Sequence, residues 1–430
     1  MKRICVIDVA GMSLRLLRSA EGLWVHSLHS PPRAMRATFP ALRASVQASM
    51  TTGAEPGAHG IIAGGVYRRE SHEVSLYECS NTLLSRKRFW HAGRMGGRPK
   101  VAMLFWSNPL AGAADVVVGA SNYCLTDREP VAVPQGLCAS LRGKLGTFDS
   151  PGLRGPKASW RVCRWIVAAA EEVWREHRPD LQFVYLPGVN FEMVRHGPDS
   201  PQAMEALRQV DALAKRLADA VAADGGRTVV LSDGGHVPVR RAGCPNVLLR
   251  RAGLLKVRAS GAGEQADLEN SLAFALVDHQ VAHLFCGDES AADEAARAVV
   301  GDPAVAAVVP RDRLFDEGLG RDRAGERILL AAPDAWFCYR WWEDDAAAPA
   351  IAFKAETPGK LGYDPCELLP GPAGGDIGFD PALVRTSRGL ADTPVEDQPV
   401  VAATCDLPLD EFPAVTDVAG MLERLMLQRA

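Results

Sequence analysis

The 430-residue sequence lacks any apolar run long enough to span a bilayer, and it lacks repeats at the period of a solenoid. Its first apolar run, within residues 2–9, is too short for the hydrophobic region of a signal peptide. No small-residue cleavage site follows it. We therefore expect a cytoplasmic protein that does not bind a membrane.

Paired cysteine motifs and an excess of one charge are also missing. The ten cysteines are scattered without a CxxC pair or zinc-ribbon spacing, which argues against a disulfide framework or a structural zinc site. We expect most of them to be small buried side chains. The net charge is −4, and basic residues form only short pairs such as Arg240-Arg241. This charge gives no general attraction to a nucleic acid polymer.

Apolar residues are abundant, at 47% against 23% charged residues, so the chain can bury a large core. Short β-branched runs alternate with segments of helical periodicity, which predicts an α/β fold. We expect a single domain over residues 1–430, in which 284–345 forms a small α+β subdomain. The predicted strands cover residues 2–9, 101–106, 181–187, 228–232 and 328–332. The predicted helices cover 158–177, 202–223 and 415–428, and a loop is expected at 188–200.

Residues 39–67 read FPALRASVQASMTTGAEPGAHGIIAGGVY, an order of Pro, Thr-Gly, His-Gly and Gly-Gly that a core segment does not need. Further strings follow along the chain: VYLP, HGPDSP, VDHQVAH, PDAWFCYRWW and GYDP. Together they resemble the nucleotide pyrophosphatase/phosphodiesterase branch of the alkaline phosphatase superfamily, over nearly the whole chain. The resemblance implies a three-layer sandwich with a central, mostly parallel sheet. It also implies a site at the carboxyl ends of the strands.

The same resemblance implies phosphoryl transfer between two zinc ions by a Thr or Ser hydroxyl, and here the chain departs from the pattern. Asp8 and Asp233 match metal-ligand positions. Other residues stand at the remaining functional positions: Arg43 at the nucleophile, Asn190 at a carboxylate, Gly234 at a further ligand, and Pro358 and Arg388 at two histidines. Arginine neither loses its proton nor ligates a cation. We therefore predict a rebuilt site without zinc or another cofactor.

In this fold Arg43 and Arg388 are expected to meet beside Asp8 and Asp233. They would either form structural ion pairs with these carboxylates or bind a phosphate or carboxylate ligand. Ser45 lies in the first turn of a predicted helix, whose N-terminus favours an anion. The candidate substrate-binding residues are therefore Arg43, Ser45, Asn190 and Arg388.

Four residues are candidates for acid–base catalysis: Asp8, Asp233, His196 and His236. The two histidines are equally typical of loops at the solvent edge. A second set would hold metal if the usual chemistry survived with other ligands: Asp8, Asp233, Asp278, His279 and His283. The last three residues of that set are also explained by a hydrogen-bonded structural cluster.

Three functions follow from these alternatives. The first is binding of a phosphorylated or other anionic small molecule, with altered catalysis. The second is a non-catalytic relative that serves as a binding or scaffold partner. The third is a zinc phosphodiesterase with relocated ligands. The sequence is compatible with a homo-oligomer in each case.

Overall fold

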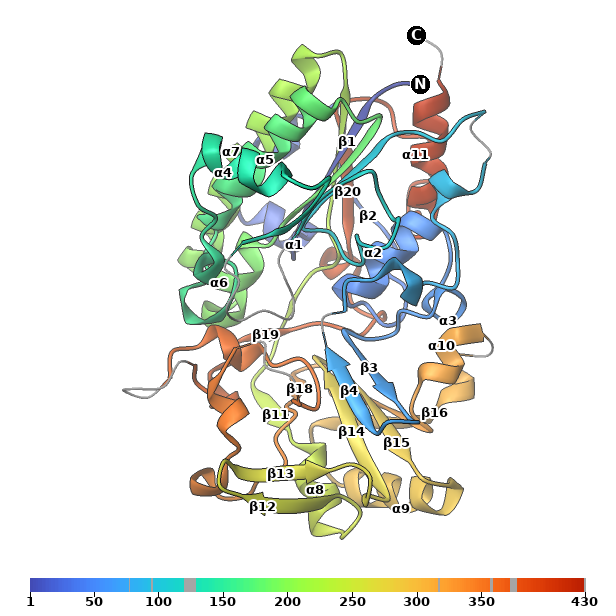
Figure 1. The fold of residues 1–430 in the computed structure, drawn as a ribbon, viewed down its shortest axis with the longest axis vertical. Helices are drawn as coiled ribbons and strands as arrows, with labels where there is room; N and C mark the ends of the chain where they lie inside the picture. The colour runs from blue at the N-terminus through green and yellow to red at the C-terminus, as the bar shows by residue number, and fades with distance from the viewer. Residues whose placement is uncertain are drawn as a thin grey trace.

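The computed structural model describes residues 1–76, 78–93, 96–119, 129–315, 318–355, 359–371 and 377–428. The chain forms two lobes along its long axis, each built around its own sheet (Figure 1). Both chain ends lie in the lobe with the larger sheet. Each sheet has its own group of buried apolar residues. Two cores therefore face one another across the middle of the molecule.

The larger sheet has eight strands in its described part. Their order is β2 (Ser30–Ala34), β20 (Val400–Ala403), β9 (Arg227–Leu231), β1 (Ile4–Val9), β8 (Leu181–Leu186), β5 (Val101–Leu104), β6 (Val116–Gly119) and β7 (Val131–Val133). The strands from β9 to β6 run parallel, whereas β20 and β7 run antiparallel to them. Strands β1, β8, β5 and β6 are buried along their whole length. Burial on both faces explains why these segments read as apolar runs.

Helices cover both faces of this sheet (Figure 1). On one side lie α4 (Leu137–Leu145), α5 (Val162–His177), α6 (Gly188–His196) and α7 (Pro201–Ala223). On the other lie α2 (Arg43–Thr52), α3 (Pro56–His59) and α11 (Asp417–Leu427), while α1 (Leu14–Arg18) follows β1 in the chain. Apolar residues of α5 recur three and four positions apart and are buried. The predicted α/β sandwich is confirmed.

The smaller sheet is antiparallel, in the order β14 (Ala273–Asp278), β15 (Val281–Cys286), β17 (Arg327–Ala331) and β16 (Val305–Pro310). Its helices are α8 (Pro245–Arg251), α9 (Glu289–Val299) and α10 (Gly318–Arg323). The remaining strands of the described residues form four two-stranded pairs: β3 (Gly65–Arg68) with β4 (Glu73–Leu76), β10 (Val237–Pro238) with β19 (Thr386–Ser387), β11 (Arg241–Gly243) with β18 (Ala335–Phe337), and β12 (Lys256–Ser260) with β13 (Gly263–Asp267). Segment 284–345 contains α9, β16, α10, β17 and β18, whereas α8, β12, β13, β14 and the start of β15 precede it.

The loop predicted at 188–200 is wrong over most of its length. Helix α6 occupies Gly188–His196 and is followed by Gly197 at a φ of 95°. Buried Val189, Phe191 and Met193 lie on this helix. Packing of these side chains outweighs the turn-forming tendency of the neighbouring Gly, Asn and Pro residues.

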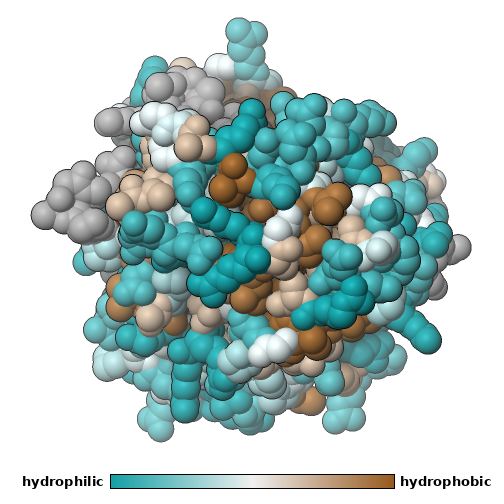
Figure 2. All heavy atoms as spheres, turned by 90° about the horizontal axis from the view of Figure 1, so that it is seen from below, coloured by the Kyte–Doolittle hydropathy of each residue, from teal (hydrophilic) through white to brown (hydrophobic). Residues whose placement is uncertain are grey.

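Seen from the end that carries the smaller sheet, hydrophilic side chains cover most of the surface (Figure 2). Hydrophobic side chains gather there only in small patches. Within the described ranges, no helix is long and apolar enough to cross a membrane.

Candidate functional site

A cavity of about 220 Å³ lies where the carboxyl ends of the larger sheet's parallel strands face the smaller sheet. Its walls include the start of α2, the segment after β5, and the end of β14. Open α/β sheets bind ligands at this end of their strands. The cavity therefore lies where the resemblance predicts a site.

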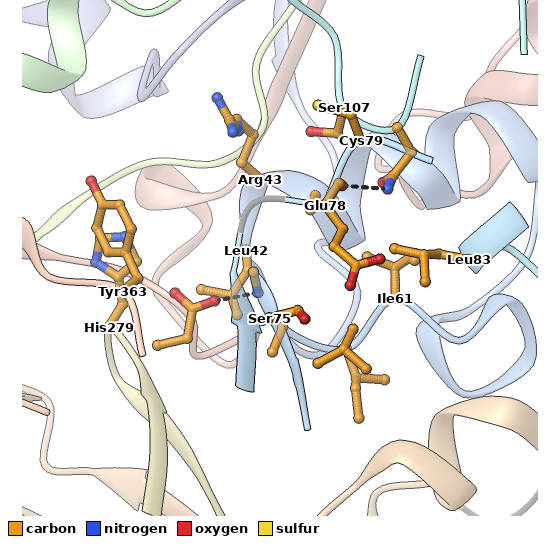
Figure 3. Close-up of a pocket in the computed structure, with 18 of the residues that line it drawn as sticks. Leu42, Arg43, Ile61, Ser75, Glu78, Cys79, Leu83, Ser107, His279 and Tyr363 are labelled. Carbon is orange, nitrogen blue, oxygen red and sulfur yellow. Dashed lines mark hydrogen bonds between the residues drawn. The ribbon is translucent and has the colours of Figure 1, made fainter. Parts of the chain in front are cut away.

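Arg43 is the first residue of α2 and lines the cavity. Its guanidinium carbon lies 5.0 Å from the centre of the Tyr185 ring, which is a cation–π contact. Figure 3 shows Arg43 between Tyr363 with His279 on one side and Ser107 on the other. In the described part of the chain, no carboxylate forms an ion pair with Arg43. Burial disfavours its charge, but Tyr185 and Asp233 together raise its pKa.

Asp8 lies on β1, fully buried and directly opposite Tyr185 in the parallel ladder of β1 and β8. Gln47 lies one helical turn after Arg43 and donates a hydrogen bond of 2.6 Å to Asp8 Oδ2. Asp8 Oδ1 has no partner among the described residues. Burial, and then the nearby Asp233, raise the pKa of Asp8 well above its usual range. These surroundings favour the protonated carboxyl.

Asp233 follows β9 and is also fully buried. Arg388 Nη1 donates to Asp233 Oδ2 at 2.8 Å, and the Gly11 amide donates to Oδ1 at 3.2 Å. Arg388 itself is 9% exposed, and its Nε has no partner in the part of the chain that the structure describes. Burial opposes the charge of Arg388, but Asp233 raises its pKa. Of the two alternatives for the arginines, the structural ion pair applies to Arg388.

Asn190 reaches the cavity from α6, and its buried Oδ1 has no partner in the described ranges. Ser45 does not line the cavity, although it lies only two residues beyond Arg43. Its side chain is fully buried on another face of α2. The structure thus brings Asn190, but not Ser45, to the cavity that holds Arg43.

The two candidate histidines also lie off the cavity wall. His236 is buried behind it, with Nδ1 3.2 Å from the Thr386 hydroxyl, and burial lowers its pKa well below the usual value. His196 lies at the end of α6 beside Glu192, and its side chain is 40% exposed. Since it faces solvent, the structure separates His196 from the two aspartates.

Asp278, His279 and His283 each form a hydrogen bond with a different part of the protein. Asp278 Oδ2 accepts the Gly64 amide at 2.6 Å, and burial raises the pKa of this carboxyl to about 6. His279 places Nδ1 3.3 Å from the Ser387 hydroxyl and packs on Tyr363, with ring centres 4.7 Å apart. Both Asp278 and His279 line the cavity.

His283 also borders the cavity, but its ring nitrogens face the protein backbone. Its Nε2 lies 3.4 Å from the Ile62 carbonyl oxygen, and the Gly325 amide lies 3.5 Å from Nδ1. Burial lowers the pKa of His283 to about 4. These contacts are those of a hydrogen-bonded structural histidine.

The sequence model of the type I phosphodiesterase/nucleotide pyrophosphatase family matches residues 19–364, which is most of the chain. The chain belongs to this family. The predicted membership is therefore confirmed. Comparison with curated proteins found no match.

Two solved structures show the same fold as this phosphodiesterase-family chain. Phosphonoacetate hydrolase from Sinorhizobium meliloti 1021, in complex with phosphonoformate, has a TM-score of 0.66 and 15% identity, covering 99% of this chain and 96% of that one. Murine ectonucleotide pyrophosphatase/phosphodiesterase 5 has a TM-score of 0.61 and 14% identity, covering 100% and 96%. At such identities the likeness shows the fold alone, and it confirms the predicted alkaline phosphatase-like architecture.

The residues of this family member do not fit the two-zinc site that the resemblance implies. The described ranges contain no group of three or more His, Cys, Asp or Glu side chains placed to hold a metal ion. Asp8 and Asp233 are only two carboxylates, and the second already binds Arg388. A divalent ion beside them would be repelled at short range by that guanidinium. Pro358, at a lost histidine position, lies outside the described residues.

Sequence reasoning missed Tyr185, Gln47 and Tyr363. Gln47 follows Arg43 by four residues, and this spacing in a helix places both side chains on one face. Tyr185 stands near the carboxyl end of an apolar strand, where ligands of parallel sheets bind. Only Tyr363 has no such local signal, because it approaches His279 from a distant part of the chain.

Proposed function

We propose that this phosphodiesterase-family chain binds a small phosphorylated or otherwise anionic molecule in the cavity beside Arg43. Binding uses guanidinium groups in place of metal ions, and phosphoryl transfer by a zinc-activated hydroxyl is lost. The observation that carries this proposal is the unequal state of the two arginines. Arg388 is ion-paired with Asp233, whereas Arg43 lines the cavity without an ion pair to any described carboxylate.

A cation that is held in place but not neutralised favours an anionic ligand. Stacking on Tyr185 fixes the guanidinium of Arg43 without cancelling its charge. Its planar set of N–H donors matches the oxygens of phosphate and carboxylate. Charge-assisted hydrogen bonds of this kind contribute about 1.5–3 kcal/mol each.

Unpartnered polar atoms around Arg43 support the same proposal. Asp8 Oδ1, Asn190 Oδ1 and Arg388 Nε are buried and have no partner among the residues described. Buried polar groups nearly always have a hydrogen-bond partner, supplied by protein, water or ligand. The Arg388 Nε–H would donate to an anion held by Arg43, because Arg388 also lines the cavity.

The position of Arg43 argues against the usual hydroxyl chemistry. It stands where the family resemblance implies the nucleophile, and a guanidinium cannot attack phosphorus because it stays protonated. The nearest hydroxyl along the same helix, Ser45, does not reach the cavity.

Calorimetric titration with inorganic phosphate and phenyl phosphate, in buffer containing a chelator, tests the proposal. The expected result is binding that the chelator leaves intact and that Arg43→Gln weakens by roughly 10- to 100-fold, from the loss of one charge-assisted contact. Arg258→Gln is the control, because the Arg258 side chain is 71% exposed and does not line the cavity. Equal binding by both variants would overturn the role of Arg43.

Metal analysis of the purified protein tests the zinc alternative directly. We expect fewer than one zinc ion per chain. About two zinc ions per chain, with ligand binding abolished by the chelator, would favour relocated zinc ligands instead. Hydrolysis of a phosphodiester that disappears in Asp8→Ala would show that catalysis survives in the rebuilt site.

A further inference from the structure

Two cysteines that are far apart in the sequence become neighbours where β11 and β18 end. These strands are parallel, with Gly243 opposite Phe337, and the Cys338 amide continues the ladder by donating to the Gly243 carbonyl at 2.8 Å. Cys244 and Cys338 are the next residues of the two strands. The nine cysteines in the described ranges are free thiols, so this pair is reduced.

The spacing of this pair suits a disulfide. Neighbouring strands lie about 4.8 Å apart, within the range of roughly 4.4–6.8 Å between the Cα atoms of bonded cysteines. The parallel register also directs the two side chains to the same side of the strand pair, next to one another. Little backbone movement is therefore needed to join them.

The two thiols differ in exposure and in acidity. Cys244 is half-buried and can meet a small reagent, whereas Cys338 is 3% exposed. The neighbouring Cys338 lowers the pKa of Cys244 and outweighs the opposing effect of burial, and Arg340 lowers it further. The neighbouring Cys244 and burial raise the pKa of Cys338. This asymmetry matches an attacking thiol and a resolving thiol.

We infer that Cys244 and Cys338 form a redox-active dithiol, which a hydroperoxide oxidises to a disulfide. The Cys244 thiolate attacks one peroxide oxygen, the O–O bond breaks, and hydroxide leaves and takes a proton to become water. The Cys338 sulfur then attacks the sulfenic acid of Cys244 and releases a second water. Two thiols and one hydrogen peroxide thus give one disulfide and two waters, with both electrons passing to the peroxide.

The disulfide would lie close to the cavity. Strand β18 is hydrogen-bonded to a wall of the cavity through the Phe337 amide, which donates to the His279 carbonyl at 2.7 Å. Oxidation would tie β18 covalently to β11 beside that contact. The inference rests on the strand register and on the backbone hydrogen bond beside the two cysteines, and it does not depend on the proposed anion ligand.

The experiment treats the whole protein with one equivalent of hydrogen peroxide, blocks the remaining thiols with N-ethylmaleimide, and maps the peptides by mass spectrometry. The expected product is a Cys244–Cys338 peptide pair that dithiothreitol separates. In Cys338→Ser the disulfide is absent and a dimedone adduct of Cys244 accumulates. In Cys244→Ser neither product appears.

Cys405 provides the matched control within the same chain. It is half-buried like Cys244, but burial raises the pKa of its thiol instead of a neighbouring thiol lowering it. Cys244 should therefore react with N-ethylmaleimide faster than Cys405 at neutral pH, because a larger fraction of it is thiolate. Full alkylation of both Cys244 and Cys338 after peroxide would overturn the inference. A disulfide between Cys338 and Cys366 would also overturn it.

Discussion

The buried ion pair between Asp233 and Arg388 gives the sharpest test of the site. The two groups lie 2.8 Å apart from nitrogen to oxygen, with Asp233 fully buried and Arg388 nearly so. With charge centres about 4 Å apart and an effective dielectric constant of about 20, their attraction is about 4 kcal/mol. Asp233→Asn leaves the Arg388 guanidinium buried without its counter-charge. We expect the free energy of unfolding to fall by about 3–5 kcal/mol.

Urea unfolding followed by far-UV circular dichroism measures this loss as a shift of the midpoint at constant slope. A second change, Arg388→Met, should restore much of the stability of Asp233→Asn, because it removes the stranded charge. The control is Asp334→Asn, which breaks an exposed pair with Arg241 at 2.7 Å and should hardly move the midpoint.

The same substitution should have the opposite effect on ligand binding. Removing the carboxylate from beside the arginines frees Arg388 to join Arg43 on an anion. Phosphate affinity should therefore rise by roughly tenfold, which corresponds to 1.4 kcal/mol. An Asp233→Asn variant as stable as Asp334→Asn would refute this account of the ion pair. So would an Asp233→Asn/Arg388→Met double variant whose loss of stability equals the sum of the losses in the two single variants. Weaker phosphate binding by a folded Asp233→Asn would refute the anion site.

Two further substitutions follow from the geometry. The raised pKa of Asp8 means that its contribution to stability is complete at low pH and is lost as the pH rises from the unfolded pKa of about 3.9 through the folded value. At about pH 7, Asp8→Asn should therefore have a higher urea midpoint of unfolding than the parent protein. The difference between the two midpoints should shrink toward pH 4, and a difference that does not change with pH would contradict this. Gly362 has a φ of +137°, and a Cβ there would lie 1.9 Å from the Val277 carbonyl oxygen. Gly362→Ala should thus lower the free energy of unfolding by several kcal/mol. Gly143→Ala lies in helix α4, where no atom is within 4 Å of the added Cβ, and should raise it by about 0.5–1 kcal/mol. Similar melting temperatures for the two variants would contradict the tight contact at Gly362.

Much of the architecture could be predicted from local sequence. Strands such as β1 and β8 are buried on both faces and read as apolar runs, while α5 and α7 show helical periodicity, so their positions are visible without tertiary information. The order of the motifs indicated the fold and placed Arg43 at the carboxyl end of the sheet. The positions of these strands and helices, and the place of Arg43, depend on residue type and spacing along the chain. Both can be read from the sequence without a structure.

Only the tertiary structure decided how the charged groups pair. Arg43 and Arg388 have the same chemistry, so nothing local distinguishes the arginine that neutralises Asp233 from the one that faces the cavity. The same holds for Tyr185 beside Asp8 and for Cys244 beside Cys338, because both contacts come from the register of parallel strands. His196 lies outside the site because its position at the end of α6 exposes its side chain to solvent. Strand register and helix orientation are set by packing between distant segments, so they exist only in the folded chain.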